Sequence, residues 1–176
     1  MKMTVSMLQK LKKICDVNSY TIYQYKPTVW KPLLIHMEAI YFRRRIRLFL
    51  DCFAGNCVYY LVQNDCFIGY CVVSRGGTFR YQFSTKKDII VGPYYISESH
   101  RGKRLSELLL TQVLAFWKEN YEYAYDYIEK SNIASIKASQ AVGLEIIQEV
   151  NITPFIRKLV IDNEGEYYLL RMNNTD

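Results

Sequence analysis

The stretch YYISESHRGKRLS, at residues 94–106, decides the fold of this chain. It begins at the end of an apolar run, IIVGPYYI at 89–96, which is typical of a buried strand, and it continues through a polar loop that contains Gly102. Beyond the loop, apolar side chains recur with the period of an amphipathic helix packed on a sheet. They are Leu105, Leu108, Leu109, Val113, Phe116 and Trp117. The stretch therefore predicts a strand that turns through a loop into a long helix.

The loop at 97–104 has the chemistry of an anion site. Backbone N–H groups at the start of a helix, the dipole behind them and basic side chains beside them favour a group such as pyrophosphate. Arg101, Lys103 and Arg104 supply the basic side chains. Taken alone, the same residues also fit an ordinary connection from strand to helix with a basic surface.

Gly92 and Pro93 interrupt the strand that precedes this loop. Proline removes a backbone donor from the ladder, and glycine in a strand often marks a bulge. We therefore expect a central strand that splays away from a neighbour.

The residues upstream of this strand predict an antiparallel hairpin. Two apolar runs, at 57–62 and 67–73, flank a short turn at 63–66. A further strand is expected at 20–25, where apolar and polar residues alternate. Helices are expected between that strand and the hairpin.

The segment 29–53 carries the residues of those helices. It mixes apolar and basic side chains, and Pro32 is expected to start or break a helix. Its densest charge, the arginines within 43–47, fits a solvated helix face better than an anion-binding rim.

The residues downstream predict a return to alternating strands and helices. A strand is expected at 123–128, a helix at 131–142 that Gly143 ends, and two strands near 145–152 and 166–172. This order implies a single domain of the α/β (α+β) class, with a central mixed, mostly antiparallel sheet and helices on both faces.

Composition limits the functional classes. The chain has 176 residues, of which 50% are hydrophobic, and a net charge of +6, which suits a polyanionic partner such as nucleic acid or a nucleotide cofactor. No apolar run is long enough to cross a membrane, so we expect a cytoplasmic protein with no membrane partner. The five cysteines match neither a redox pair nor a zinc site, and we expect free thiols and no metal.

A second segment, IEKSNIASIKASQAVGL at 128–144, also bears on function. Asn132 falls at the start of a helix, where asparagine is a common cap, and Gly143 falls where a helix end needs a left-handed residue. Each position has a purely structural explanation when it is considered alone.

Together and in this order, the two segments resemble the GNAT superfamily of acetyl-CoA-dependent N-acetyltransferases. In that superfamily the cofactor motif is Arg/Gln-x-x-Gly-x-Gly/Ala after the fourth strand. A later motif has Asn, a small residue three positions on, and Gly-Phe at the helix end. The resemblance covers about 89–144. The matching positions are Arg101, Gly102 and Lys103 in the first motif and Asn132, Ser135, Gly143 and Leu144 in the second.

The resemblance implies a single GNAT-like domain over residues 1–176 that moves an acetyl or other acyl group from acetyl-CoA to a primary amine. The amine would attack directly within a ternary complex. The coenzyme would lie in the gap beside the splayed strand, on peptide groups, loop N–H groups and one side-chain amide. The residues implied for coenzyme A are Tyr95, Ile96, Arg101, Gly102, Lys103, Arg104, Leu105, Ser106, Asn132 and Ser135.

Three departures from the family pattern limit this carry-over. Arg104 replaces the motif glycine and either stays helical with its side chain turned outward or contacts the phosphate directly. Ser106 replaces the final glycine or alanine. Ser139 stands where many members place the tyrosine that protonates the departing thiol, and we expect it to be a passive helix residue.

The catalytic base has three candidates. Acylation needs a neutral amine, so an alkyl ammonium must lose a proton to a base or a water chain. The candidates are Glu98, beside the loop, Asp126, on the later strand, and Tyr94, which could relay through water. His36 and Glu38 are weaker candidates for binding the acceptor.

The acceptor and the assembly stay open. A small molecule or an amino sugar is favoured as the amine acceptor, with a protein acceptor as the alternative, and the protein is expected to be a monomer or a homodimer. Two other functions are weighed: a non-catalytic acyl-CoA-binding or regulatory domain of the same fold, and a basic nucleic-acid-binding module. No nucleic-acid-binding motif supports the last, so no nucleic-acid partner is expected.

Coenzyme A or acetyl-CoA should raise the melting temperature, because a ligand that binds only the native state stabilises it by mass action. At a concentration about 100 times the dissociation constant the gain is about 2.7 kcal/mol. A thermal-shift titration into the millimolar range, with ATP as a control polyanion, measures this. No upward shift, or an equal shift with ATP, would count against a coenzyme A site.

Overall fold

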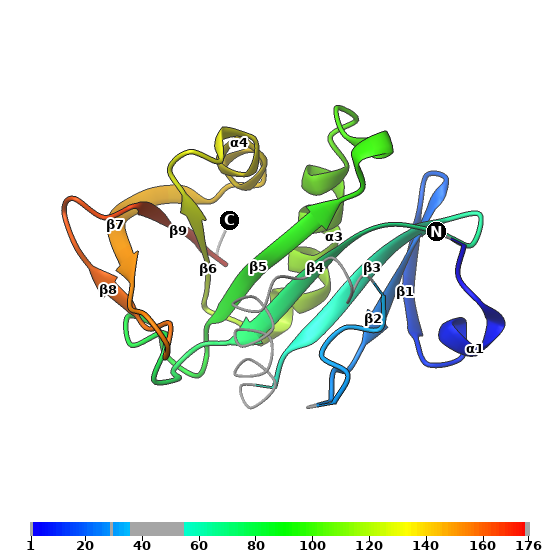
Figure 1. The fold of residues 1–176 in the computed structure, drawn as a ribbon, viewed down its shortest axis with the longest axis horizontal. Coiled ribbons are helices and arrows are strands. Elements are labelled where there is room, and N and C mark those ends of the chain that lie inside the picture. The colour runs from blue at the N-terminus through cyan, green and yellow to red at the C-terminus, as the bar shows by residue number, and fades with distance from the viewer. Residues whose placement is uncertain (1, 29, 36–54, 175–176) are drawn as a thin grey trace.

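The computed structural model describes residues 2–28, 30–35 and 55–174 (Figure 1). The helices predicted within 29–53 lie largely outside these residues, as do the arginines of 43–47 and the two weaker acceptor candidates, His36 and Glu38. Residues 30–35 are described and form no helix, so a helix start at Pro32 is wrong for that short stretch.

A nine-stranded open sheet organises the chain, in the order β1-β2-β3-β4-β5-β6-β9-β7-β8. The β5–β6 pair is parallel, and every other pair is antiparallel. The strands are β1 (Lys12–Val17), β2 (Tyr20–Tyr25), β3 (Cys57–Gln63), β4 (Cys66–Arg75), β5 (Ile89–Ile96), β6 (Tyr123–Glu129), β7 (Glu145–Ile152), β8 (Leu159–Ile161) and β9 (Tyr167–Asn173). Within the described residues, the α-helices are α1 (Val5–Leu8), α3 (Leu105–Trp117) and α4 (Ile133–Ala141), and two 3₁₀ turns are η1 (Glu98–His100) and η2 (Lys118–Asn120).

The predicted hairpin is confirmed as β3 and β4. Its strands pair outward as far as Gln63 and Cys66, so the loop is only the two residues between them. Asn64 and Asp65 have φ values of 49° and 59°, the left-handed conformation that a tight two-residue hairpin loop needs. Asparagine and aspartate tolerate this conformation better than most residues, which explains why the chain turns here.

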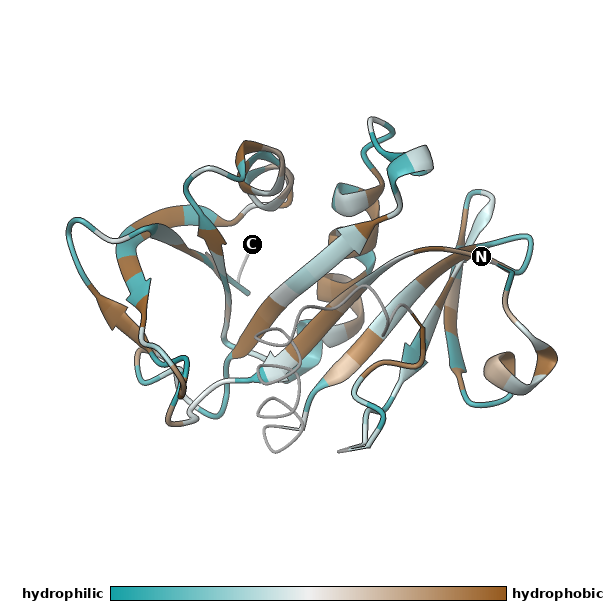
Figure 2. Ribbon diagram, viewed as in Figure 1, coloured by the Kyte–Doolittle hydropathy of each residue, from teal (hydrophilic) through white to brown (hydrophobic). Residues whose placement is uncertain are grey.

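Helix α3 packs on one face of the sheet with a different set of residues from the predicted one. Its buried side chains are Leu105, Leu109, Leu110, Val113 and Leu114. Phe116, which the periodicity had placed in the core, is 42% exposed. Figure 2 shows brown segments interspersed with paler ones along α3. Leu110 and Leu114 add apolar residues outside the predicted stripe, so the period alone did not fix the buried face.

Helices cover both faces of the sheet, as predicted. Residues of α3 and α4 pack with Tyr59, Cys71 and Val91 in one core. On the other face, Met7 and Leu8 of α1 pack against a second core around Tyr60 and its neighbours. No helix within the described ranges is long and apolar enough to span a membrane.

The strand β5 splays from β6, and this divergence creates the space for a site. The two strands pair only at Ile89 with Ala124 and Ile90 with Tyr125. On its other side β5 stays paired to β4 as far as Ile96, with a register shift between Cys71 and Val73. The shift lies opposite the Gly92–Pro93 step, so the bulge predicted from these two residues is confirmed. Figure 1 shows β5 and β6 diverging beyond it.

Candidate active site

A cavity of about 560 Å³ lies beside the splayed part of β5, between the loop at 97–104 and helix α4. Most of the residues predicted for coenzyme binding line it; Lys103 does not. Of the three base candidates, only Tyr94 lines it. The lining residues are Tyr94, Tyr95, Ile96, His100, Arg101, Gly102, Arg104, Leu105, Ser106, Glu107, Asn132, Ala134, Ser135 and Ala138.

The loop at 97–104 places the start of α3 beside this cavity. Gly102 has φ +78°, and a Cβ built there would meet nothing within 4 Å. The helix begins after Arg104, which is its N-cap, and no side chain caps the first turn. Its first N–H groups are therefore left for an anion, which the helix dipole favours at this position.

Arg104 adopts a left-handed conformation, with φ 53° and ψ 27°. The alternative in which Arg104 stays helical is therefore wrong. Glycine enters this conformation without penalty, whereas a residue with a Cβ pays roughly 1–2 kcal/mol. Arg104 thus holds, at some cost in strain, a backbone conformation that glycine would adopt freely at this position.

Arg101 ties the loop back to the end of β5. Its Nε donates to the carbonyl oxygen of Ile96 at 3.2 Å, and its guanidinium carbon lies 5.8 Å from the centroid of the Tyr95 ring. A weak contact of 3.7 Å joins its Nη1 to Oε1 of Glu98. The side chain of Glu98 is 82% exposed and does not line the cavity, so the structure does not bring this base candidate to the site.

The other two base candidates are joined through Ser139 in a buried chain of hydrogen bonds. The Oγ of Ser139 donates to Oδ2 of Asp126 at 2.7 Å. The hydroxyl oxygen of Tyr94 lies 3.1 Å from that Oγ, and the hydroxyl also donates to the carbonyl oxygen of Ser135 at 2.7 Å. Because the single proton of Ser139 goes to Asp126, the contact between Tyr94 and Ser139 can use only the Tyr94 proton, which is shared with the shorter bond to the Ser135 carbonyl oxygen. Asp126 and Ser139 are 3% and 1% exposed.

Asp126 lies on β6 directly after Tyr125, the last residue of β6 that pairs with β5. A Cβ built on Gly92 would lie 3.1 Å from its Oδ1 and would crowd the carboxylate, and the φ of +102° at this position also favours glycine. The sequence indicated Tyr94 and Asp126 separately, but it did not predict that hydrogen bonds through Ser139 connect them. Ser139 was predicted to be passive, and the structure instead places it between them.

Burial determines the protonation of Tyr94 and Cys71, which lie near Asp126. Burial first, and the charge of Asp126 second, raise the pKa of the Tyr94 phenol well above its ordinary value. The same two causes raise the pKa of the Cys71 thiol. Both groups are therefore neutral at physiological pH, and Cys71 is unsuited to act as a thiolate nucleophile.

Asn132 and Ser135 contribute from the start of α4. The Oδ1 of Asn132 accepts from the backbone N–H of Ser135 at 3.2 Å, so the structural role as a helix cap is confirmed. That bond leaves the amide nitrogen of Asn132 to contact a ligand in the cavity. Gly143, with φ +96°, ends the helix as predicted.

None of the curated proteins matches the chain in sequence. A sequence model described as the acetyltransferase (GNAT) family matches residues 23–143, which is more than half of the chain.

Solved structures match the fold at low identity. A putative acetyltransferase from Salmonella typhimurium, solved with acetyl-CoA, has 18% identity and a TM-score of 0.59 over 90% of this chain and 96% of that one. Ribosomal-protein-S5-alanine acetyltransferase from Vibrio fischeri has 15% identity and a TM-score of 0.61, with coverages of 94% and 98%. Spermidine N-acetyltransferase from Vibrio cholerae, in complex with CoA and spermine, has 10% identity and a TM-score of 0.52, with coverages of 68% and 66%.

Arg104→Gly should raise the free energy of unfolding by up to about 1 kcal/mol, because glycine adopts the left-handed conformation without the Cβ penalty. Urea denaturation measures the change. Lys103→Gly is the matched control, since Lys103 has no positive φ in the structure and glycine there should only lose stability. If both variants lost stability equally, Arg104 would not hold this conformation in solution.

Proposed function

Because the chain belongs to the acetyltransferase (GNAT) family, we propose that it transfers an acetyl group from acetyl-CoA to the primary amine of an acceptor, by direct attack within a ternary complex. The observation that carries the proposal is the cavity beside β5. The uncapped start of α3 lies beside it, and the half-buried Tyr94 hydroxyl in its lining is bonded through Ser139 to the Asp126 carboxylate.

The residues of this cavity fit coenzyme A. Beyond Ile90 no ladder joins β5 to β6, so the edge of β5 that faces β6 around Tyr95 and Ile96 suits the amides of a pantetheine arm. The loop N–H groups from Arg101 to Ser106 suit the pyrophosphate, and the amide nitrogen of Asn132 suits the pantetheine. When bound, the coenzyme supplies an activated thioester, and an N–H of Tyr95 or Ile96 would stabilise charge on its oxygen.

Tyr94, Ser139 and Asp126 form a path that can take a proton from the attacking amine. The Tyr94 proton is shared between Ser135 O and Ser139 Oγ, so its oxygen is left as an acceptor. Before the amine nitrogen attacks the acyl carbon, its ammonium form would pass its extra proton to the Tyr94 oxygen, and the N–H proton released as the amide forms would go to the departing thiolate or to solvent. The Tyr94 proton passes to Ser139, and the Ser139 proton passes to Asp126. Thiolate is the leaving group, and Glu98 takes no part.

Acetyl-CoA consumption should depend on an added primary amine. A release assay with a thiol reagent, run over an amino sugar, a polyamine, an amino acid and a peptide amino terminus, measures this. The breadth of the panel follows from the neighbours, since one is named for a protein alanine and another for spermidine. Coenzyme binding with no turnover on any acceptor would favour the non-catalytic acyl-CoA-binding alternative.

Ser139→Ala separates the proposed proton path from the passive role expected from sequence. A passive serine predicts activity within about tenfold of the parent, whereas an interrupted proton path predicts a loss of about a hundredfold in kcat, at the low end of general-base effects. Tyr94→Phe should lose a similar factor. Ser131→Ala is the matched control, because its hydroxyl donates to Glu129 at 2.9 Å on the surface, outside the cavity. Ser139→Ala activity within tenfold would overturn the path.

A further inference from the structure

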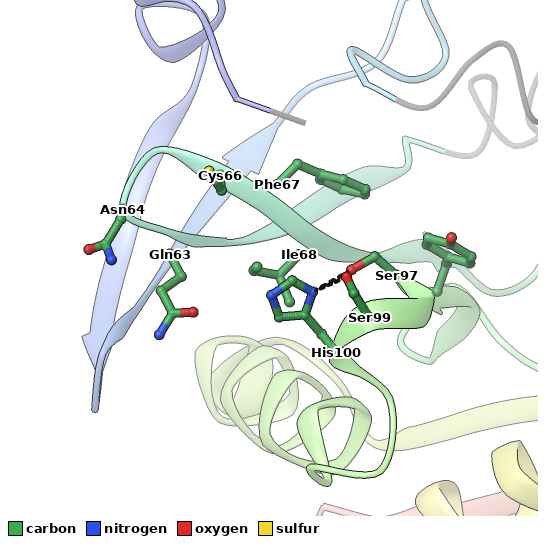
Figure 3. A pocket seen from close by; sticks show the side chains of 9 residues that line it. Gln63, Asn64, Cys66, Phe67, Ile68, Ser97, Ser99 and His100 are labelled. Atoms are coloured by element: carbon green, nitrogen blue, oxygen red, sulfur yellow. Dashed lines mark hydrogen bonds between the residues drawn. The ribbon is translucent and has the colours of Figure 1, made fainter.

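A second cavity, of about 460 Å³, lies where the β3–β4 hairpin meets the turn after β5 (Figure 3). This volume falls in the range of about 300–1,000 Å³ that is common for small-molecule sites. The lining residues come from the end of the hairpin and from the 3₁₀ turn η1 and its flanks. They are Gln63, Asn64, Cys66, Phe67, Ile68, Tyr95, Ser97, Ser99 and His100.

This cavity is separate from the acyl-transfer end of the first one. Successive side chains of a strand point to opposite faces, so Tyr94 and Tyr95 diverge. Tyr94 packs with the core under α3 and α4, while the ring of Tyr95 stacks on Tyr70 at 6.0 Å in the opposite core. Ser97 lies about 10 Å along the strand from Tyr94, at roughly 3.3 Å per residue.

The chemistry of the lining favours an uncharged polar ligand. None of its residues is Asp, Glu, Lys or Arg. A charged ligand would lose hydration without gaining an opposite charge, which is costly. Amides, hydroxyls and an imidazole both donate and accept hydrogen bonds, as the hydroxyl groups of a ligand require. Phe67, Ile68 and Tyr95 supply an apolar wall for its carbon skeleton.

His100 is held so that one ring nitrogen is left for a ligand. Its Nδ1 lies 2.9 Å from Oγ of Ser97 and 2.9 Å from Oγ of Ser99. The other nitrogen, Nε2, points away from these serines toward the side of the cavity where Gln63 lies (Figure 3). The Nε2 of Gln63 donates to Oγ of Ser19 at 2.8 Å, which leaves its Oε1 as an acceptor.

We propose that this second cavity binds an uncharged, hydroxyl-rich small molecule of monosaccharide size, and that its occupancy strengthens coenzyme binding. The ligand's hydroxyls bond the Nε2 of His100 and the Oε1 of Gln63, and its carbon skeleton lies on the Phe67–Tyr95 wall.

The coupling follows from residues that the two cavities share. His100 and Tyr95 line both. The N–H of His100 donates to Ser97 O at 2.9 Å, and the N–H of Ser97 donates to Ile68 O at 2.8 Å, so the turn is bonded to the second cavity's wall. Arg101, the first of the residues whose N–H groups are proposed to bind the pyrophosphate, directly follows His100 in the chain. A ligand that fixes this turn reduces the ordering cost of coenzyme binding, and the coupling is reciprocal.

Disulfide exchange at Cys66 tests the ligand class, because this half-buried free thiol lines the cavity. The full chain is equilibrated with disulfides of thioglucose, mercaptoacetate and cysteamine, which present an uncharged polyol, an anion and a cation. Peptide mass mapping then assigns each adduct to its cysteine. We expect the thioglucose adduct at Cys66 to exceed each of the others by about threefold or more.

Cys15 is the matched control, since it is also a half-buried free thiol but lies on β1. It should show no preference for thioglucose. Gln63→Leu, a change at the surface end of the hairpin, should abolish the preference at Cys66. Equal labelling by all three probes at Cys66, the same preference at Cys15, or a preference that survives Gln63→Leu would overturn the site.

Calorimetry with desulfo-CoA, which has no thiol to reverse the label, tests the coupling. Protein carrying thioglucose on Cys66 is compared with protein carrying only an S-methyl group there. The dissociation constant should be about threefold or more lower with thioglucose. An equal or higher constant would overturn the coupling. This binding experiment needs no turnover, so its failure is distinguishable from a failure of acetyl transfer.

Discussion

The parallel pairing of β5 with β6 ends after two residues, and the site depends on that early end. Beyond Ile90, β5 remains paired to β4 on one side only, although buried backbone groups need hydrogen-bond partners. A glycine at position 92 allows the bulge and leaves room for the Asp126 carboxylate. The resulting gap presents peptide groups to a ligand that carries amides, and this fits a pantetheine arm better than a compact substrate.

The two ends of the gap differ in charge and in solvent access. At the open end, the loop places Arg101, the left-handed Arg104 and the first N–H groups of α3 beside the cavity. At the closed end, Asp126 is buried and its carboxylate accepts a hydrogen bond from the Ser139 hydroxyl. Phosphate groups suit the first environment, whereas proton transfer suits the second, because Asp126 and Ser139 are buried there and are joined by a hydrogen bond. In the proposed complex, this polarity would set the direction of the coenzyme.

Sequence predicted the elements that have strong patterns and missed those that depend on tertiary contacts. The hairpin, β5, α3, β6 and α4 follow from runs of apolar residues and from glycine and asparagine at turns. β1 was missed because Lys12, Lys13 and Asp16 make an exposed edge strand look like a loop. β8 was missed because it has three residues and follows a turn in which Phe155 and Arg157 have positive φ. The Ser139–Asp126 bond spans two elements, so no local period signals it.

The serine at position 139 and the tyrosine at position 94 depend on each other. The Tyr94 oxygen lies only 3.1 Å from Ser139 Oγ, so a ring attached at 139 would need the space that the Tyr94 hydroxyl occupies. The hydroxyl thus reaches α4 from the neighbouring strand rather than from the helix itself. Its proton is directed at the helix and its pKa is raised, so it is poorly suited to protonate a thiolate. Its oxygen is suited to accept a proton. A thiol with a pKa near 8.5 leaves without an acid, whereas an amine cannot attack while it keeps its extra proton. In the proposed mechanism, the arrangement therefore assists deprotonation of the amine rather than departure of the thiolate.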